Sequence, residues 1–425
     1  MRILRAFTTF LIAVAYMAAA TSAQAPTATV EASDASEGRL EDRPAPDDDR
    51  ARVDIRDIIR RLFGHTANDR ELERPPGATA AIVPVVGAQP HVGFMAGVGA
   101  AVEFPMGPPE RTPFSSVNAS VTFSTEKQLG ASLNATIYGA DNAWRLEARN
   151  AFNQKNANDV ELGTSSAASE ALTLDYESTT FADTLYVRAW RRLDVGAGII
   201  YMGQRRIEPA DGRSDTSAFL SYSSRNGFNP DSQTSAGGTI ALAYDGRDNA
   251  NDAYAGWYLA AAFRQYLKGL WGGDSQWQEL FTDVRTYRTL TEDHRHRLAF
   301  RTFGEFVTSG TAPYFSLPES AGDPDGRADR GYAEGRFRGE RMIDGEIEYR
   351  GLVTRNGLIG VVSFVNMSTL TNLEQGERLF HSVAVGGGGG VRLLLSKRSR
   401  TNLCLDVGFG RNGSNGVYLG VRDAF

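Results

Sequence analysis

The chain has 425 residues, with 45 Lys and Arg against 51 Asp and Glu, which gives a formal net charge of -6 at pH 7. This acidic balance gives no support for nucleic acid as a partner, and the single cysteine, Cys404, excludes an internal disulfide. After residue 23 no segment approaches the roughly 18 consecutive apolar residues of a membrane-spanning helix.

The N-terminus has the pattern of a secretory signal peptide. Arg2 and Arg5 precede an apolar run at 6–20, and small residues follow at 21–25. The alternative is a retained membrane anchor, but a spanning helix needs about 20 apolar residues. We therefore predict a signal peptide at 1–23 and export of the chain.

Residues 24–77 do not have the composition of a folded domain. The stretch 26–50 holds eight acidic residues against three arginines, among prolines, alanines and serines, so it cannot bury a core. The stretch 52–63 then places its isoleucines and its final Leu and Phe on one helical face, and Gly64 follows. We predict a disordered acidic periplasmic segment with a short amphipathic helix at 52–63. This helix is either marginal on its own or docked on the following domain.

From residue 78 to residue 425 the pattern changes to segments of about ten residues that alternate apolar with polar side chains, as strands do. At 343–350, for example, charged residues occupy even positions and apolar or small residues odd ones. We predict strands at 79–87, 91–104, 114–125, 130–138, 143–152, 179–193, 195–206, 235–245, 256–266, 276–288, 295–306, 341–352, 358–366, 381–396, 401–410 and 415–425.

The lengths of the connections support this assignment. The long connections at 153–178, 207–234 and 307–340 all follow odd-numbered strands, whereas connections after even-numbered strands are mostly short. An even strand number with short periplasmic turns and long external loops is typical of outer-membrane barrels. We therefore predict an all-β fold, a sixteen-stranded antiparallel transmembrane β-barrel at 78–425, in the outer membrane of a Gram-negative bacterium.

A soluble sandwich or propeller is the alternative, but it would need one shared apolar core. One face of the predicted strands is instead rich in charges, which need water, while the other face needs lipid. The predicted lumenal charges include Arg145, Arg149, Arg188, Glu279, Asp283, Arg285, Arg297, Arg301, Glu305, Asp344, Glu346, Glu348 and Asp406.

Five groups of short motifs stand in a fixed order along the predicted barrel. They are PVVG at 84–87, YDGRD at 244–248 with GWYL at 256–259, RGY at 330–332 with GRFR at 335–338, EIEYR at 346–350, and GVYLGVRDAF at 416–425. In this order they resemble the BamA/TamA family of outer-membrane proteins, the bacterial surface-antigen type of barrel. Large members also carry periplasmic POTRA domains. Residues 26–77 are too few for even one such domain plus the acidic tail, so we expect a member lacking POTRA domains.

The resemblance implies a lumenal latch, because in this family an Arg-Gly-Tyr/Phe loop tip folds back into the lumen to meet acidic residues on the following strands. Carried over, Arg330 is the lumenal arginine, Gly331 permits the bend and Tyr332 packs beside it. Glu348 is the expected acidic partner. Asn366 stands where a second family acid is expected, so this latch has one charge partner fewer.

The chain ends in a predicted C-terminal barrel signal made of Phe425, Val421 and Leu419, which share one face if the last strand runs to the end of the chain. Asp423 is a polar exception on that face.

No catalytic or cofactor motif is present. The glycine run at 386–390 lacks a following Lys-Ser/Thr, there is no Gly-x-Ser-x-Gly, and His294 and His296 lack a third ligand nearby. We expect no enzyme activity, no metal and no cofactor, and we expect the glycine run to pack closely against the inserted loop.

The resemblance implies an assembly or translocation factor that inserts proteins or lipids into the outer membrane through a weak barrel seam. Pro84 supports a seam at the first strand, because proline cannot donate to a strand ladder. Outer-membrane lipid and client outer-membrane proteins or periplasmic factors are the implied partners. The alternative is a passive channel or structural barrel with a loop-plugged lumen, which the short periplasmic segment favours.

Overall fold

The computed structural model describes residues 52–55, 57–58, 78–89, 92–108, 111–166, 172–209, 217–323, 327–397, 400–421 and 423–425. The predicted signal peptide and most of the predicted helix at 52–63 lie outside the described residues.

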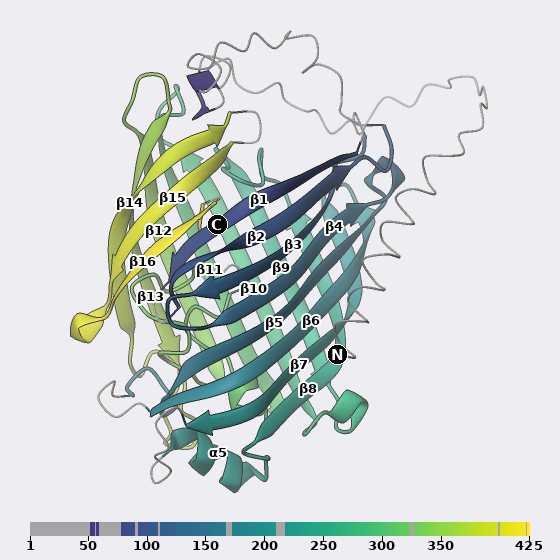
Figure 1. Cartoon of the computed structure of the whole chain (residues 1–425), viewed down its shortest axis with the longest axis vertical. Coiled ribbons are helices and arrows are strands. Elements are labelled where there is room, and N and C mark those ends of the chain that lie inside the picture. Colours follow the sequence, from purple (N-terminus) through teal and green to yellow (C-terminus); the bar gives the residue numbers. More distant parts are fainter. Residues whose placement is uncertain are drawn as a thin grey trace, which may run out of the picture. The chain divides into compact units, whose positions relative to one another are not determined.

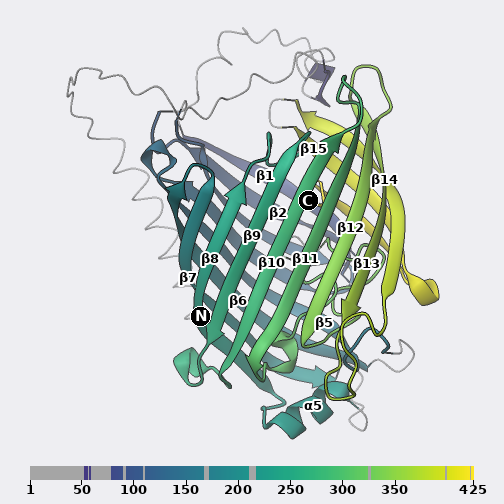
Figure 2. The ribbon, with the colours of Figure 1, turned by 180° about the vertical axis from the view of Figure 1, so that it is seen from behind.

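The described residues from 78 onward form a closed barrel in which each strand pairs with its neighbours in the sequence and β1 pairs with β16 (Figures 1 and 2). Every pair is antiparallel. The predicted sixteen-stranded antiparallel barrel is therefore confirmed. The strands are β1 (Thr79–Gln89), β2 (Gly93–Phe104), β3 (Ser115–Ser124), β4 (Leu129–Tyr138), β5 (Trp144–Asp159), β6 (Leu172–Trp190), β7 (Leu193–Pro209), β8 (Ser232–Asp245), β9 (Gly256–Tyr266), β10 (Trp277–Thr289), β11 (His296–Gly310), β12 (Arg341–Leu352), β13 (Ile359–Leu370), β14 (Ala384–Ser396), β15 (Thr401–Phe409) and β16 (Asn415–Val421).

In the described residues from 78 onward, helical structure is confined to the connections. One α-helix, α5 (Ala218–Asn226), lies between β7 and β8, at the bottom of the barrel in Figure 1. Short 3-10 turns occur at η1 (Ala140–Asn142), η2 (Leu270–Gly272), η3 (Tyr314–Ser316) and η4 (Arg411–Gly413). No helix in the described part of the chain has the length and apolarity to cross a membrane.

The strands alternate between an apolar outer face and a charged or small inner face. In β13, Val361, Val365 and Met367 are exposed on the outside, while Phe364 and Asn366 between them are buried inside. Charged residues fill the inner face of β12 in the same way. Such an outer face suits lipid and such an inner face suits a polar lumen.

Some boundaries differ from the predicted ones. β5 and β6 continue through most of the predicted connection at 153–178 and leave only 160–171 between them. The residues added to β5 are mainly polar on both faces, because ladder hydrogen bonds do not require apolar side chains outside the lipid region, and the period-2 hydropathy signal is lost there. The residues added to β6 do alternate, with Leu172, Leu174 and Tyr176 at every second position, but the predicted strand did not include them. The predicted connection at 207–234 likewise contains the ends of two strands and α5.

We call the end with the long connections the external end and the other the periplasmic end. At the periplasmic end, the described part of the predicted N-terminal helix contacts barrel turns. The Val53 amide donates to the Asn356 carbonyl at 2.9 Å, and the Lys397 amide donates to Asp54 Oδ2 at 3.0 Å. Arg52 Nη1 donates to the Tyr254 hydroxyl at 3.0 Å. These contacts favour the docked alternative.

Candidate functional site

The connection between β11 and β12 enters the lumen, and its side chains are among the most buried in the protein. Arg330 and Phe337 are 0% exposed, and Tyr332 and Arg338 are 1% exposed. The backbone of this connection has a positive φ of +114° at Gly331, a conformation in which a residue with a side chain would be strained. The connection is therefore a packed element of the lumen, as the resemblance implied.

Arg330 lies at the centre of this packing. Its Nη2 donates to Glu346 Oε1 at 2.5 Å and also contacts Glu348, while its Nη1 donates to Asp406 Oδ2 at 2.8 Å. The guanidinium carbon lies 3.6 Å from the centre of the Phe364 ring. Burial would lower the pKa of Arg330, but the three carboxylates raise it above its ordinary value, so the group is charged.

The strand period explains how these partners converge. Glu346 and Glu348 are two residues apart on β12, so both point into the lumen. Asp406 arrives from the inner face of β15. Sequence reasoning named Glu348 as the partner of Arg330 but missed Glu346 and Asp406. Both belonged to the predicted lumenal charges, but the alternation that placed them inside carries no information about which arginine they meet.

Asn366, where the resemblance implied an acid, contacts the main chain of the loop tip. Its Nδ2 donates to the backbone carbonyl of Arg330 at 2.9 Å. It therefore holds the main chain of the loop tip, and Asp406 supplies charge from another strand.

Gly331 and Tyr332 complete the tip. The Gly331 amide donates to the Tyr418 hydroxyl at 2.8 Å. A Cβ at Gly331 would lie 2.7 Å from the Phe409 carbonyl carbon. The Tyr332 hydroxyl donates to the Val385 carbonyl at 2.7 Å and accepts from the Arg411 amide at 2.8 Å. We call the set Arg330, Gly331, Tyr332, Glu346, Glu348, Asn366 and Asp406 the latch.

The glycines of β14 and β15 make room for the latch. A Cβ at Gly386 would lie 3.0 Å from the Arg330 carbonyl oxygen, and a Cβ at Gly408 would lie 2.7 Å from the Gly331 amide nitrogen. Of the run at 386–390, Gly386 thus packs closely against the inserted loop, whereas Gly388 and Gly390 lie against Val407, Leu405 and Asp406 of the neighbouring strand β15. Gly408 was missed, because a single glycine in a strand does not reveal what approaches it.

The latch continues into a second group of charges toward the periplasmic end. Arg350 Nε donates to Glu348 Oε1 at 2.6 Å, and Arg350 Nη2 donates to the backbone carbonyl of Phe425 at 2.8 Å. Arg392 contacts Asp406 and donates through Nε to Asp423 Oδ1 at 2.5 Å. The latch is therefore linked to the end of the chain.

The expectation that Phe425 shares a strand face with Val421 and Leu419 is wrong. β16 ends at Val421, which is exposed on the outer face, whereas Phe425 is 6% exposed and lies near Tyr287, with ring centres 6.4 Å apart. The physical reason is Asp423, whose carboxylate is stabilised by lumenal donors and would be costly in lipid. The chain therefore leaves the wall after Val421.

The seam between β1 and β16 is short. β1 pairs with β2 along all of its 11 residues, but among the described residues its register with β16 contains only Ala88 opposite Leu419. Toward the periplasmic end, the edge of β1 before Ala88 has no partner strand among the described residues. Ile82 on this part of β1 is 81% exposed.

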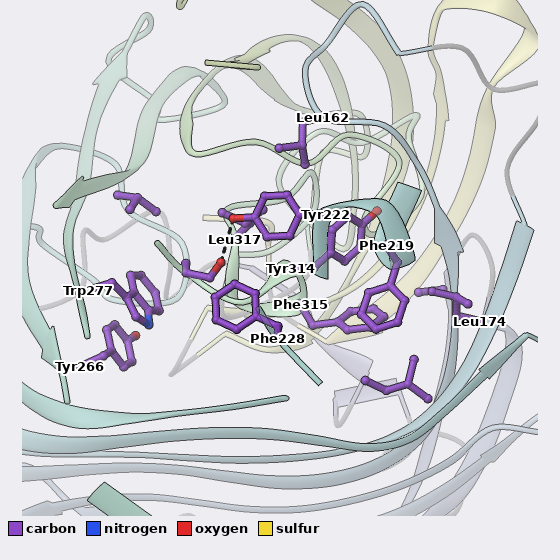
Figure 3. Close-up of a cluster of buried hydrophobic side chains, with 14 of the residues drawn as sticks. Leu162, Leu174, Phe219, Tyr222, Phe228, Tyr266, Trp277, Tyr314, Phe315 and Leu317 are labelled. Atoms are coloured by element: carbon purple, nitrogen blue, oxygen red, sulfur yellow. Dashed lines mark hydrogen bonds between the residues drawn. The ribbon is translucent and has the colours of Figure 1, made fainter. Parts of the chain in front are cut away.

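Buried apolar side chains from the long connections and the strand ends form a cluster at the external end (Figure 3). The Tyr222 hydroxyl on α5 donates to the Ala312 carbonyl at 2.8 Å. The N-terminus of α5 is held by Asp159, which accepts from the Phe219 amide at 2.7 Å. The cluster contains Ala157, Leu162, Leu174, Ile200, Ile207, Phe219, Tyr222, Phe228, Tyr266, Trp277, Val307, Ala312, Tyr314, Phe315 and Leu317.

Comparisons with known proteins support the fold. No protein-family model and no curated protein matches the sequence. Among solved structures, the chain is similar to BamA from Haemophilus ducreyi lacking POTRA domains 1-3, with 14% identity and a TM-score of 0.57 over 81% of this chain and 70% of that chain. It is also similar to CdiB from Escherichia coli, with 10% identity and a TM-score of 0.51 over 84% of this chain and 71% of that chain.

CdiB from Acinetobacter baumannii gives 9% identity and a TM-score of 0.50, and the match spans 81% of this chain and 59% of that chain. At these identities the likeness concerns the fold. The chain has the barrel fold of BamA and CdiB, so the predicted resemblance is confirmed at that level.

Proposed function

We propose that this protein is an outer-membrane assembly or translocation factor that inserts client proteins or lipids into the membrane through the β1–β16 seam. The observation that carries the proposal is the length of the seam. Among the described residues, β1 and β16 are joined by one aligned pair, Ala88 with Leu419. In contrast, β1 pairs with β2, and β16 with β15, along most of their lengths.

An unpaired strand edge presents a row of backbone donors and acceptors to any extended chain. The part of β1 before Ala88 is such an edge, and Pro84 within it cannot donate. A client strand that adds to this edge would gain ladder hydrogen bonds while it crosses the lipid, where unpaired backbone groups are costly.

The alternative, a passive channel, is disfavoured by material at both ends of the lumen. The apolar cluster of Figure 3 lies at the external end. At the periplasmic end, Asp252 of the β8–β9 turn reaches Arg297 and Arg350 at 2.9 and 3.3 Å, and Phe425 packs nearby. The latch occupies the space between.

The test reconstitutes the purified protein in liposomes and measures the folding rate of a second barrel together with ion conductance. A cysteine pair at Ala88 and Leu419, in a Cys404→Ala background, closes the seam when oxidised or bridged by a short thiol reagent. A matched pair at Val86 and Ala96 bridges β1 to β2 and leaves the seam free.

We expect the unbridged protein to accelerate client folding, the seam bridge to remove at least about nine-tenths of that acceleration, and reduction to restore it. The control bridge leaves it unchanged. A large steady conductance without any acceleration of folding would instead support the channel.

A further inference from the structure

A polar cleft of about 400 Å³ lies at the external end of β5 and β6, beside the turn between β3 and β4. Apart from Tyr176, every described residue that lines it has a polar or charged side chain. The side chains that matter below are Glu126 and Lys127 of the turn, Gln154 of β5, Asp175 and Glu177 of β6, and Arg206 of β7.

The cleft lies on the outer face of the barrel wall. Gln154 lies opposite Glu177 in the β5–β6 register, and the two-residue period of a strand places Glu177 on the same face as Leu185, which is 47% exposed. Lys155, the next residue of β5, turns inward instead, and its Nζ donates to Glu334 Oε1 of the inserted loop at 2.6 Å. The outward groups of β5 and β6 therefore belong to the surface that faces the membrane lower down.

The height of the cleft is that of the lipid headgroups. Below it on the outer face, Phe181 is 40% exposed, and its ring centre lies 5.9 Å from that of Tyr201. Aromatic side chains of this kind mark the boundary of the apolar band in barrels. Glu177 is only four residues closer to the external end of β6, which is roughly 13 Å at the rise of a strand. The cleft therefore begins where the acyl chains end.

Several groups in the cleft can reach a ligand. Gln154, Asp175 and Lys127 are exposed, and their side chains make no hydrogen bond with another described residue. Arg206 stands at a bulge of β7 with φ +53° and donates through Nη1 to Glu177 Oε1 at 2.6 Å. The Arg206 side chain is 76% exposed, so other N–H groups of its guanidinium face the solvent.

The charges of the lining are balanced, because three acidic and three basic residues contribute to it: Glu126, Asp175 and Glu177 against Lys127, Lys155 and Arg206. A balanced lining does not select a polyanion or a polycation, and a lining without aliphatic side chains does not suit an apolar ligand. A saccharide fits, because each hydroxyl both donates and accepts. Neighbouring hydroxyls also match the paired atoms of planar carboxylate, amide and guanidinium groups.

We propose that this cleft binds the saccharide headgroup of a glycolipid in the outer leaflet. The acyl chains of such a lipid lie against the apolar band below, and its sugars stand at the height of the cleft. A free saccharide has the same hydroxyl chemistry but lacks this anchorage. The volume of the cleft is within the range of about 300–1,000 Å³ that ligand pockets have. The inference does not depend on the proposed insertion function.

The test is calorimetric titration of the purified protein in detergent with deacylated lipopolysaccharide from the same bacterium. Isomaltohexaose, a neutral free saccharide, and inorganic phosphate are separate arms. The variants are Gln154→Ala, Asp175→Ala and the double variant. The matched controls are Gln375→Ala and Asp231→Ala, which are exposed on other connections at the external end. Heat-modifiable gel mobility verifies that each variant is folded.

We expect one deacylated headgroup to bind per chain, and isomaltohexaose and phosphate to bind at least about tenfold more weakly. Each single cleft variant should weaken headgroup binding about threefold to tenfold, because it removes hydrogen bonds to the sugar. The double variant should weaken it further, and both controls should bind as the wild type does.

Absence of headgroup binding by the wild-type protein would overturn the proposal, and so would unchanged binding by the folded double variant. Isomaltohexaose binding as tight as that of the headgroup would replace the glycolipid by a free saccharide. Equally tight binding of phosphate would show that the site recognises charge and not sugar hydroxyls.

Discussion

Arg330 and Asp406 are 76 positions apart in the sequence, yet Nη1 of the arginine donates to Oδ2 of the aspartate at 2.8 Å inside the barrel. One residue belongs to a connection and the other to the barrel wall near the seam, since β15 pairs with β16. The contact therefore links the position of the loop to the strands that close the barrel.

Replacing Arg330 by Ala is expected to cost about 3–5 kcal/mol of folding stability, because it leaves buried carboxylates without their charge partner. Arg330→Lys keeps the charge but cannot form the same parallel contacts, so its cost is smaller. The measurement is the midpoint of heat modifiability in detergent together with denaturant unfolding.

The control for this variant is Arg206→Ala, because Arg206 pairs with Glu177 with its side chain 76% exposed. An exposed ion pair contributes about 0–1 kcal/mol. If Arg330→Ala were as mild as the control, the latch would not stabilise the barrel.

Gly408→Ala is expected to displace the loop tip. Its Cβ would lie 2.7 Å from the Gly331 amide nitrogen and 2.9 Å from the Arg330 carbonyl carbon, and backbone atoms cannot move aside as a flexible side chain does. Overpacking of this kind costs about 1–3 kcal/mol, and loop cleavage by protease should be faster. Gly238→Ala in β8 is the control, because its Cβ would lie 3.7 Å from its nearest neighbour. Equal cleavage rates in the two variants would contradict this packing.

The barrel was predictable from the sequence because lipid outside and water inside impose opposite requirements on alternate residues of every strand. That constraint ends where the lipid ends. The prediction therefore located β5 and β6 but missed the extension of β5 at 153–159, where both faces are polar. It also missed the extension of β6 at 172–178, where a short alternation of Leu172, Leu174 and Tyr176 with polar residues is present.

The latch was only partly predictable. Alternation placed Glu346, Glu348 and Asp406 in the lumen, and the family resemblance placed Arg330 there. Which carboxylate meets which guanidinium depends on barrel curvature and on the path of the loop, and neither is encoded in a local pattern. At the chain end the sequence did contain a signal, Asp423, whose charge marks the departure from the lipid-facing strand.

Phe425→Ala is expected to destabilise refolded protein by about 3 kcal/mol, because removal of a buried aromatic ring leaves a cavity. Val421→Ala on the outer face is the control and should cost about 0.5 kcal/mol or less. Denaturant unfolding of both variants provides the comparison. If Phe425 faced lipid as Val421 does, the two substitutions would have similar effects.

The role of Phe425, Val421 and Leu419 as an insertion signal stays a prediction, and it is tested separately by membrane insertion in cells.

The N-terminal segment should divide into a dispensable part and a part that stabilises the barrel. Deleting 26–50 should leave insertion and heat modifiability unchanged, because this acidic stretch has too little apolar surface to offset its ordering entropy.

Arg52→Ala should lower the unfolding midpoint. Arg52 is 7% exposed and donates to the Tyr254 hydroxyl at 3.0 Å and to the Gly357 carbonyl at 3.2 Å. Hydrogen bonds from a charged group contribute about 1.5–3 kcal/mol, and the variant removes both of these hydrogen bonds. Both proteins are compared with the wild type after removal of the predicted signal peptide at 1–23. Loss of insertion in the deletion, or an Arg52→Ala midpoint equal to that of the wild type, would contradict this division of the segment.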